Sequence, residues 1–245
     1  MFVAASSCTT PLQLLPPIKP ILWSVSGKPR KKIMKLKIKT IYGITCKAPV
    51  AYEFHLESKR DDVNETISAQ RPETDIAVIQ SLLGGGHDNY VQSDAKLFVC
   101  VSASTLAYRD SFQRWCNELA KLIDLFGTRV VVQVGSDVPE QTLSLRWPEL
   151  TDLGSELAVA EFGKRHSRLD RLHRYKWEYC HFDAARTIHM LDATALIYCR
   201  RRGIKAIAKS VDNQSQSILS MLSGQDWQQG EYLQAFALMS NSKEV

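Results

Sequence analysis

Two short apolar segments on either side of an amphipathic one constrain the fold of this chain more than any other feature. Residues 97–101 are apolar, residues 130–134 are apolar apart from one glutamine, and both have the length of a buried strand. Between them, apolar side chains recur at helical spacing up to Phe126, after a capping residue at Asp110 or Ser111. This order predicts a βαβ unit whose two strands are parallel and buried on both faces.

A pair of strands is predicted near the N-terminus. Residues 34–39 alternate strictly between apolar residues and lysine, which indicates a strand with a row of ammonium groups on one face. Residues 41–57 can supply a second strand, interrupted at Gly43 and Pro49.

The last third of the chain has a helical composition from about Gly154 onward. Residues 184–202 keep Ala184, Ile188, Leu191, Ala195 and Tyr198 on one face at helical spacing, which predicts a helix that ends at Gly203. Shorter helices are predicted at Gln214–Leu222 and Gln228–Met239. The predicted fold class is therefore α+β or α/β, with the strand pair and the βαβ unit followed by a mostly helical third.

Three regions are expected along the chain. Residues 1–27 lack acidic residues and are rich in proline and serine, which favours a flexible arm over a secretory signal and leaves organelle import open. Residues 28–150 form the predicted α/β domain, and residues 151–245 form the helical region packed on it.

The overall composition is that of an ordinary globular protein, with 44% hydrophobic and 23% charged residues. No apolar run approaches the roughly 20 residues of a membrane-spanning helix, so that class is excluded. The six cysteines show no paired spacing, which predicts reduced thiols and an intracellular location, in the cytoplasm or the nucleus. No metal site and no cofactor is expected.

Charge is strongly polarised along the sequence. Residues 28–47 carry eight basic residues and no acidic one, and residues 161–210 carry twelve basic against five acidic residues. The stretch between them, residues 48–160, has nine basic and seventeen acidic residues. Polarised charge of this kind indicates a polyanionic partner, although lysines on an edge strand also serve to prevent aggregation.

The candidate phosphate contacts fall into two blocks. Those of the first block are Lys28, Arg30, Lys31, Lys32, Lys35, Lys37 and Lys39. Those of the second block are Lys164, Arg168, Arg171, Arg174, Lys176, Arg200, Arg201 and Arg202, with Tyr175 and Trp177 as residues that would stack on unpaired bases.

These patterns lead to the hypothesis of a non-enzymatic nucleic-acid-binding protein that prefers RNA to DNA. The acidic middle could dock onto the basic face of a neighbouring copy, as expected of a homo-oligomeric packaging protein or a viral structural or accessory protein. One alternative is a peripheral membrane or matrix-like protein that binds anionic lipid.

A second alternative is a transferase or nuclease built on the parallel sheet. Its ligand would bind beyond the carboxyl ends of the strands, near Ser102–Thr105 and Gly135–Asp137. No nucleophile and base at a recognisable spacing supports this alternative, and no catalytic residue is predicted.

Overall fold

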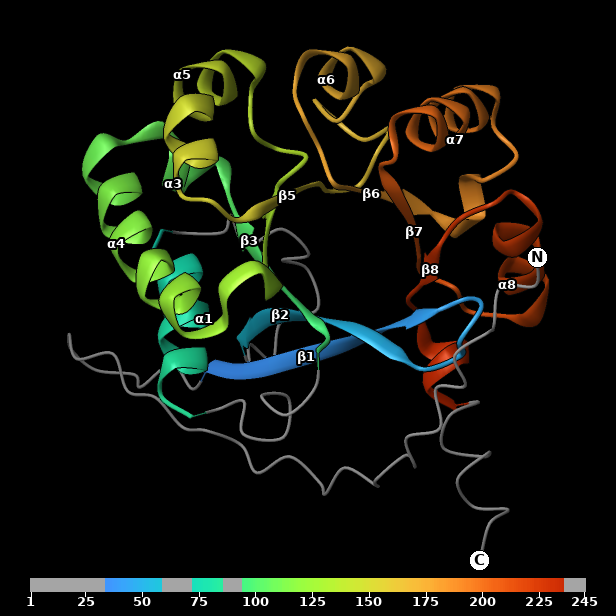
Figure 1. Cartoon of the computed structure of the whole chain (residues 1–245), viewed down its shortest axis with the longest axis horizontal. Helices are drawn as coiled ribbons and strands as arrows, with labels where there is room; N and C mark the ends of the chain where they lie inside the picture. Colours follow the sequence, from blue (N-terminus) through green and yellow to red (C-terminus); the bar gives the residue numbers. More distant parts are fainter. Residues whose placement is uncertain (1–33, 59–71, 86–93, 236–245) are drawn as a thin grey trace, which may run out of the picture.

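The computed structural model describes residues 34–58, 72–85 and 94–235, in which eight strands close into a barrel (Figure 1). The strands are β1 (Met34–Gly43), β2 (Pro49–Ser58), β3 (Lys96–Val101), β4 (Val130–Val134), β5 (Glu156–Val159), β6 (Tyr179–Asp183), β7 (Lys205–Lys209) and β8 (Trp227–Gln228). The helices are α1 (Pro72–Leu83), α3 (Ala103–Ala107), α4 (Arg109–Phe126), α5 (Glu140–Asp152), α6 (Leu169–Arg174), α7 (Met190–Arg202) and α8 (Gln214–Leu222), with the 3-10 turns η1 (Gly127–Arg129) and η2 (Ala184–Arg186).

The barrel is parallel except at its first strand. Strands β2 to β8 pair with their neighbours in parallel, whereas β1 pairs with both β2 and β8 in the antiparallel sense. The carboxyl ends of the seven parallel strands therefore meet at one end of the barrel, which we call the mouth. In barrels of alternating strands and helices this end carries the functional residues.

The helices lie around the outside of the strands (Figure 1). Helix α4 shows why: Phe112, Trp115, Leu119 and Leu122 recur every three or four residues and are all buried against the sheet. Strand β3, helix α4 and strand β4 confirm the predicted βαβ unit, and β1 and β2 confirm the predicted strand pair. None of the helices in the described ranges is both long and apolar enough to cross a membrane.

The prediction of a mostly helical last third is wrong. Strands β5 to β8 lie in this region, and residues 164–182 contain a loop, the six-residue helix α6 and most of β6. The barrel takes four strands from either side of the boundary that was predicted at residue 150. The N-terminal arm, residues 1–27, lies outside the described residues.

Two of the predicted C-terminal helices also need correction. Helix α7 begins only at Met190, and two residues of its predicted apolar face, Ile188 and Leu191, are exposed. The helix predicted from Gln228 is preceded by strand β8, and residues 231–235 are helical. The helix predicted at Gln214–Leu222 is confirmed as α8.

Candidate functional site

The barrel interior contains an apolar layer and, nearer the mouth, a polar one. The inner layer is apolar and consists of Ile41, Ala51, Phe98, Val131, Ala158, Tyr179 and Ile207, with Trp227 packed against them. Because strand residues two positions apart share a face, the residues two positions further along each parallel strand form the next layer toward the mouth. These are Glu53, Cys100, Gln133, Ala160, His181, Lys209 and Gln229, which we call the polar layer.

An ion pair between β2 and β7, which are not neighbours in the barrel, dominates the polar layer. The Lys209 Nζ atom lies 2.6 Å from Glu53 Oε1, and Gln229 donates a hydrogen bond of 2.7 Å from Nε2 to Glu53 Oε2. The Nε2 atom of His55 lies 3.2 Å from the same Oε1. The Glu53 side chain is fully buried and that of Lys209 is 17% exposed, so both carboxylate oxygens have partners supplied by the chain.

Each partner keeps the other charged. Burial alone would raise the pKa of Glu53, but the Lys209 ammonium and His55 outweigh it and hold this pKa well below its ordinary value. Burial would likewise lower the pKa of Lys209, yet the Glu53 carboxylate raises it above the ordinary value. The pair is therefore a carboxylate and an ammonium at every physiological pH.

The other titratable groups of the layer are neutral. Burial and the nearby ammonium lower the pKa of His181 to about 3, and burial raises the pKa of the Cys100 thiol far above its ordinary value. Within the described part of the chain, neither ring nitrogen of His181 has a hydrogen-bond partner, and neither has the Gln133 side-chain oxygen. The layer therefore contributes one fixed ion pair among neutral polar groups.

The neutral state of His181 leads to a prediction about acid stability. Because its pKa of about 3 in the folded state lies below the ordinary 6.5, the unfolded chain binds more protons than the folded chain between these values. The free energy of unfolding should thus fall as the pH drops below about 6.5, by up to about 1.4 kcal/mol per pH unit from this group. Urea unfolding at a series of pH values between neutral and mildly acid measures this slope.

The matched variants for this test are His181→Gln and His166→Gln. The first should flatten the slope, whereas the second, which changes an exposed histidine, should leave it as in the parent chain. Equal slopes in the parent and in His181→Gln would contradict the assignment.

The rim of the mouth carries a second ion pair and a basic loop. Beyond β5, Glu161 accepts a 2.7 Å hydrogen bond from the Ser136 hydroxyl and lies 3.0 Å from the Lys164 ammonium. The loop that follows exposes Lys164, Arg165, His166 and Arg168, which we call the basic loop. The backbone of Arg165 has a φ of 42°, and its carbonyl accepts a hydrogen bond from Arg168 Nε.

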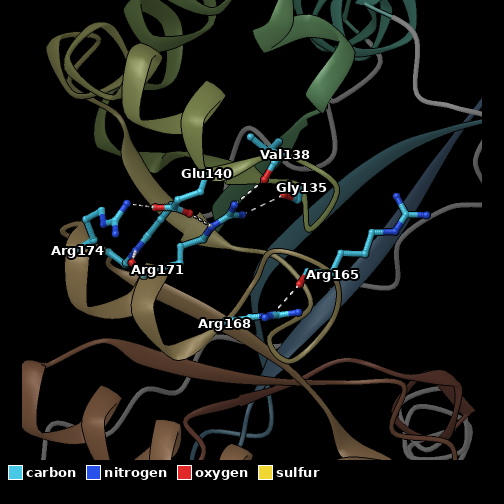
Figure 2. A network of polar contacts seen from close by, with 8 residues as sticks. Gly135, Val138, Glu140, Arg165, Arg168, Arg171 and Arg174 are labelled. Atoms are coloured by element: carbon cyan, nitrogen blue, oxygen red, sulfur yellow. Dashed lines mark hydrogen bonds and ion pairs between the residues drawn. The ribbon is translucent and has the colours of Figure 1, made fainter.

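A buried arginine fixes the base of this loop to the neighbouring one. Figure 2 shows Arg171 and Arg174 converging on Glu140, while Arg165 and Arg168 lie apart from them. Arg171 is 1% exposed and also donates to the carbonyls of Gly135 and Val138, which follow β4. Helix α6 and the β4–α5 loop are thereby held together, and with them two segments of the rim.

The comparison with known proteins assigns the barrel to a family. The sequence model of the EAL domain matches residues 73–235, which is more than half of the chain. The chain belongs to the EAL domain family. A search of curated protein sequences returned no significant match.

Solved structures of EAL proteins have the same fold. The EAL enzyme Bd1971 in its cAMP-bound form is 14% identical with a TM-score of 0.61, over 84% of this chain and 66% of that chain. The Bacillus subtilis YkuI protein, in complex with substrate c-di-GMP and calcium, is 19% identical with a TM-score of 0.64, over 80% of this chain and 54% of that one. Klebsiella pneumoniae BlrP1, as a manganese and cyclic-di-GMP complex, is 18% identical with a TM-score of 0.63, over 86% of this chain and 57% of that one. The chain thus spans between about half and two thirds of the length of these relatives, and the likeness concerns the fold.

These findings overturn the hypothesis of a nucleic-acid-binding protein that prefers RNA, including its packaging or viral form. The family model that matches this chain is that of the EAL domain, not that of a nucleic-acid-binding or viral protein. Its structural neighbours include complexes with a small cyclic dinucleotide and metal ions, not with RNA or a membrane. Polarised charge alone cannot distinguish a polymeric polyanion from a small phosphate-containing ligand.

The residues of the polar layer do not fit the divalent cation that the neighbours' complexes imply. Calcium and manganese prefer several oxygen ligands, above all carboxylates. The described layer offers one carboxylate, and its two oxygens already bond Lys209 and Gln229. The remaining members are a thiol, an imidazole, an amide and the methyl group of Ala160.

The residues predicted to contact phosphate do not all lie together in the structure. Lys28, Arg30, Lys31 and Lys32 lie outside the described residues. Lys35, Lys37 and Lys39 lie on β1, on the same strand face as Ile41, which packs inside the barrel. Because β1 runs antiparallel to β2, and Lys39 pairs in register with Glu53, this row of lysines extends outward from the mouth.

The residues of the second predicted block lie in different surroundings. Lys164 and Arg168 belong to the basic loop, whereas Arg171 and Arg174 pair with Glu140, and Lys176 lies 3.8 Å from Glu178. The stacking prediction is wrong: Trp177 is 4% exposed and donates to the Arg171 carbonyl, and the Tyr175 ring packs on Trp147. Arg200, Arg201 and Arg202 end α7, just before the start of β7, and so lie at the end of the barrel opposite the mouth.

Sequence reasoning missed the polar layer itself. Glu53, Lys209 and Gln229 are separated by up to 176 residues, and only closure of the barrel brings them together. One signal pointed to the right place: the alternative of a ligand beyond the carboxyl ends of the strands identified the mouth, although without these residues.

Proposed function

We propose that this member of the EAL domain family binds a cyclic dinucleotide at the mouth of its barrel without hydrolysing it. The observation that carries the proposal is the ion pair between Lys209 and Glu53. Hydrolysis of a phosphodiester needs a water molecule activated by a metal ion or a general base. Glu53 is a poor base because its pKa is lowered, and its two oxygens are occupied.

The positive charge around the mouth supports a ligand that carries phosphate groups. The Lys209 ammonium lies within the mouth, the lysine row of β1 extends along one side, and the basic loop follows β5 on the rim. Ammonium and guanidinium groups form strong charge-assisted hydrogen bonds to phosphate oxygens. A compact dianion such as a cyclic dinucleotide suits these groups, and several structural neighbours are complexes with c-di-GMP.

The proposal predicts binding that does not depend on a divalent cation. Equilibrium titration with c-di-GMP should give the same dissociation constant in the presence of a chelator and in the presence of manganese. Chromatography of the mixture after long incubation should show no linear dinucleotide under either condition. Manganese-dependent appearance of the linear product would contradict the proposal, and so would the absence of binding.

The lysines of β1 provide a test of where the ligand binds. The variant Lys35→Ala/Lys37→Ala/Lys39→Ala should weaken binding at least about tenfold, since a hydrogen bond to a charged group contributes about 1.5–3 kcal/mol. The matched control is Arg201→Ala/Arg202→Ala, which removes exposed cations at the opposite end of the barrel and should leave the dissociation constant unchanged.

A further inference from the structure

The polar layer contains a cation that the chain itself supplies. Solved EAL structures include complexes with calcium and with manganese, whereas here the Lys209 ammonium lies against the layer's carboxylate. We propose that Lys209 is a built-in replacement for a divalent cation and conceals a latent metal site formed by Glu53, His55 and Cys100. This inference does not rest on nucleotide binding.

The geometry of the three residues supports the latent site. One potential ligand atom from each of Glu53, His55 and Cys100 lies within 4.8 Å of the other two. The ammonium and the His55 Nε2 atom approach the same oxygen of Glu53, at 2.6 Å and 3.2 Å. A metal ion bridging His55 and this oxygen of Glu53 would therefore compete with the Lys209 ammonium for the same carboxylate oxygen.

The charges of the buried groups cancel both in the present chain and in a metal-bound chain without Lys209. In the present chain the carboxylate of Glu53 is neutralised by one ammonium. With Lys209 removed, a divalent ion would neutralise the Glu53 carboxylate together with a Cys100 thiolate, and the thiol proton would pass to solvent. Both arrangements leave the buried layer without net charge, which a low-dielectric interior requires.

The donor atoms select the kind of metal. A carboxylate oxygen, an imidazole nitrogen and a thiolate sulfur are the three ligand types of zinc. Cobalt(II) takes similar sites and reports thiolate coordination through its near-ultraviolet absorption. Calcium and magnesium, which prefer oxygen ligands alone, should bind poorly.

The test is a titration of Lys209→Met and the parent chain with Zn²⁺ and with Co²⁺, followed by calorimetry and absorption spectroscopy. The variant should bind Zn²⁺ at least about a hundredfold more tightly, because in the parent the metal must first displace a buried, paired ammonium. Cobalt should give thiolate absorption in the variant and none attributable to Cys100 in the parent. Adding Cys100→Ser to Lys209→Met should abolish that absorption.

The matched control is Lys205→Met, which removes an exposed lysine from the other end of the same strand, where its ammonium lies over the Trp227 ring. It should bind metal as the parent does. Metal binding by the parent chain that Glu53→Gln abolishes would overturn the proposal. That measurement needs only the parent and Glu53→Gln, so it remains decisive even if Lys209→Met fails to fold.

Discussion

Replacing Lys209 with methionine is expected to lower the free energy of unfolding by about 3–5 kcal/mol at neutral pH. The substitution keeps an unbranched side chain that is one heavy atom shorter and removes the ammonium. The fully buried carboxylate of Glu53 then has only Gln229 and His55 as partners. Urea unfolding followed by circular dichroism measures the loss. The loss of unfolding free energy should be smaller in mild acid. An unpaired buried carboxylate has a raised pKa, so it binds a proton there and no longer buries an uncompensated charge.

The double variant Lys209→Met/Glu53→Gln separates charge from packing. With both charges removed, most of the lost free energy of unfolding should return, since a buried ion pair is often worth no more than a neutral pair of similar volume. A double variant as unstable as Lys209→Met alone would show that the lysine acts through packing and not through its charge.

Replacing Arg171 with leucine should have an effect of similar size. Its guanidinium is 1% exposed and donates to Glu140 and to the carbonyls of Gly135 and Val138. Leucine removes all of these donors and leaves the Gly135 carbonyl with only the Val138 N–H. We expect a loss of about 3–5 kcal/mol in the free energy of unfolding. Thermal and urea unfolding of the variant measure it.

Arg174→Leu is the matched control, because Arg174 pairs with the same glutamate from a side chain that is 57% exposed (Figure 2). Exposed ion pairs contribute less than about 1 kcal/mol, so this variant should unfold nearly as the parent does. Equal losses in the two variants would indicate that Glu140, and not the buried carbonyls, accounts for the effect of Arg171.

The sequence was informative where one physical signal dominated. Strand β4 and helix α8 begin and end where the sequence predicted, and α4 and β3 differ by one or two residues. In β3, β4 and α4 the burial pattern follows the apolar pattern, because the strands of the βαβ unit are enclosed on both faces and α4 buries a single stripe.

The later strands were missed because the functional layer interrupts their apolar pattern. His181 in β6, Lys209 in β7 and Gln229 just after β8 point into the barrel where a buried strand would ordinarily place apolar residues. Strands β5 and β8 are also only four and two residues long. A chain that buries polar residues at its site therefore loses the periodicity by which its strands are recognised.

The sequence indicated where the candidate site lies, but not which residues form it. The carboxyl ends of the predicted parallel strands give the correct end of the barrel. The partnership of Glu53 with Lys209 depends on a register across the closed barrel, which local patterns do not contain. Arg171 was misread as a surface cation for the same reason, since its carbonyl partners lie more than thirty residues away in the sequence.

The covalent attachment of the Lys209 ammonium to β7 has a consequence for how the mouth responds to its surroundings. A dissolved ion occupies a site according to its concentration, whereas a tethered group is present at a fixed, very high effective concentration. The charge inside this barrel therefore cannot be withdrawn by chelation or by scarcity of metal. A ligand that binds at the mouth therefore encounters the same ammonium charge at any metal concentration. Its own concentration alone determines how often the mouth is occupied.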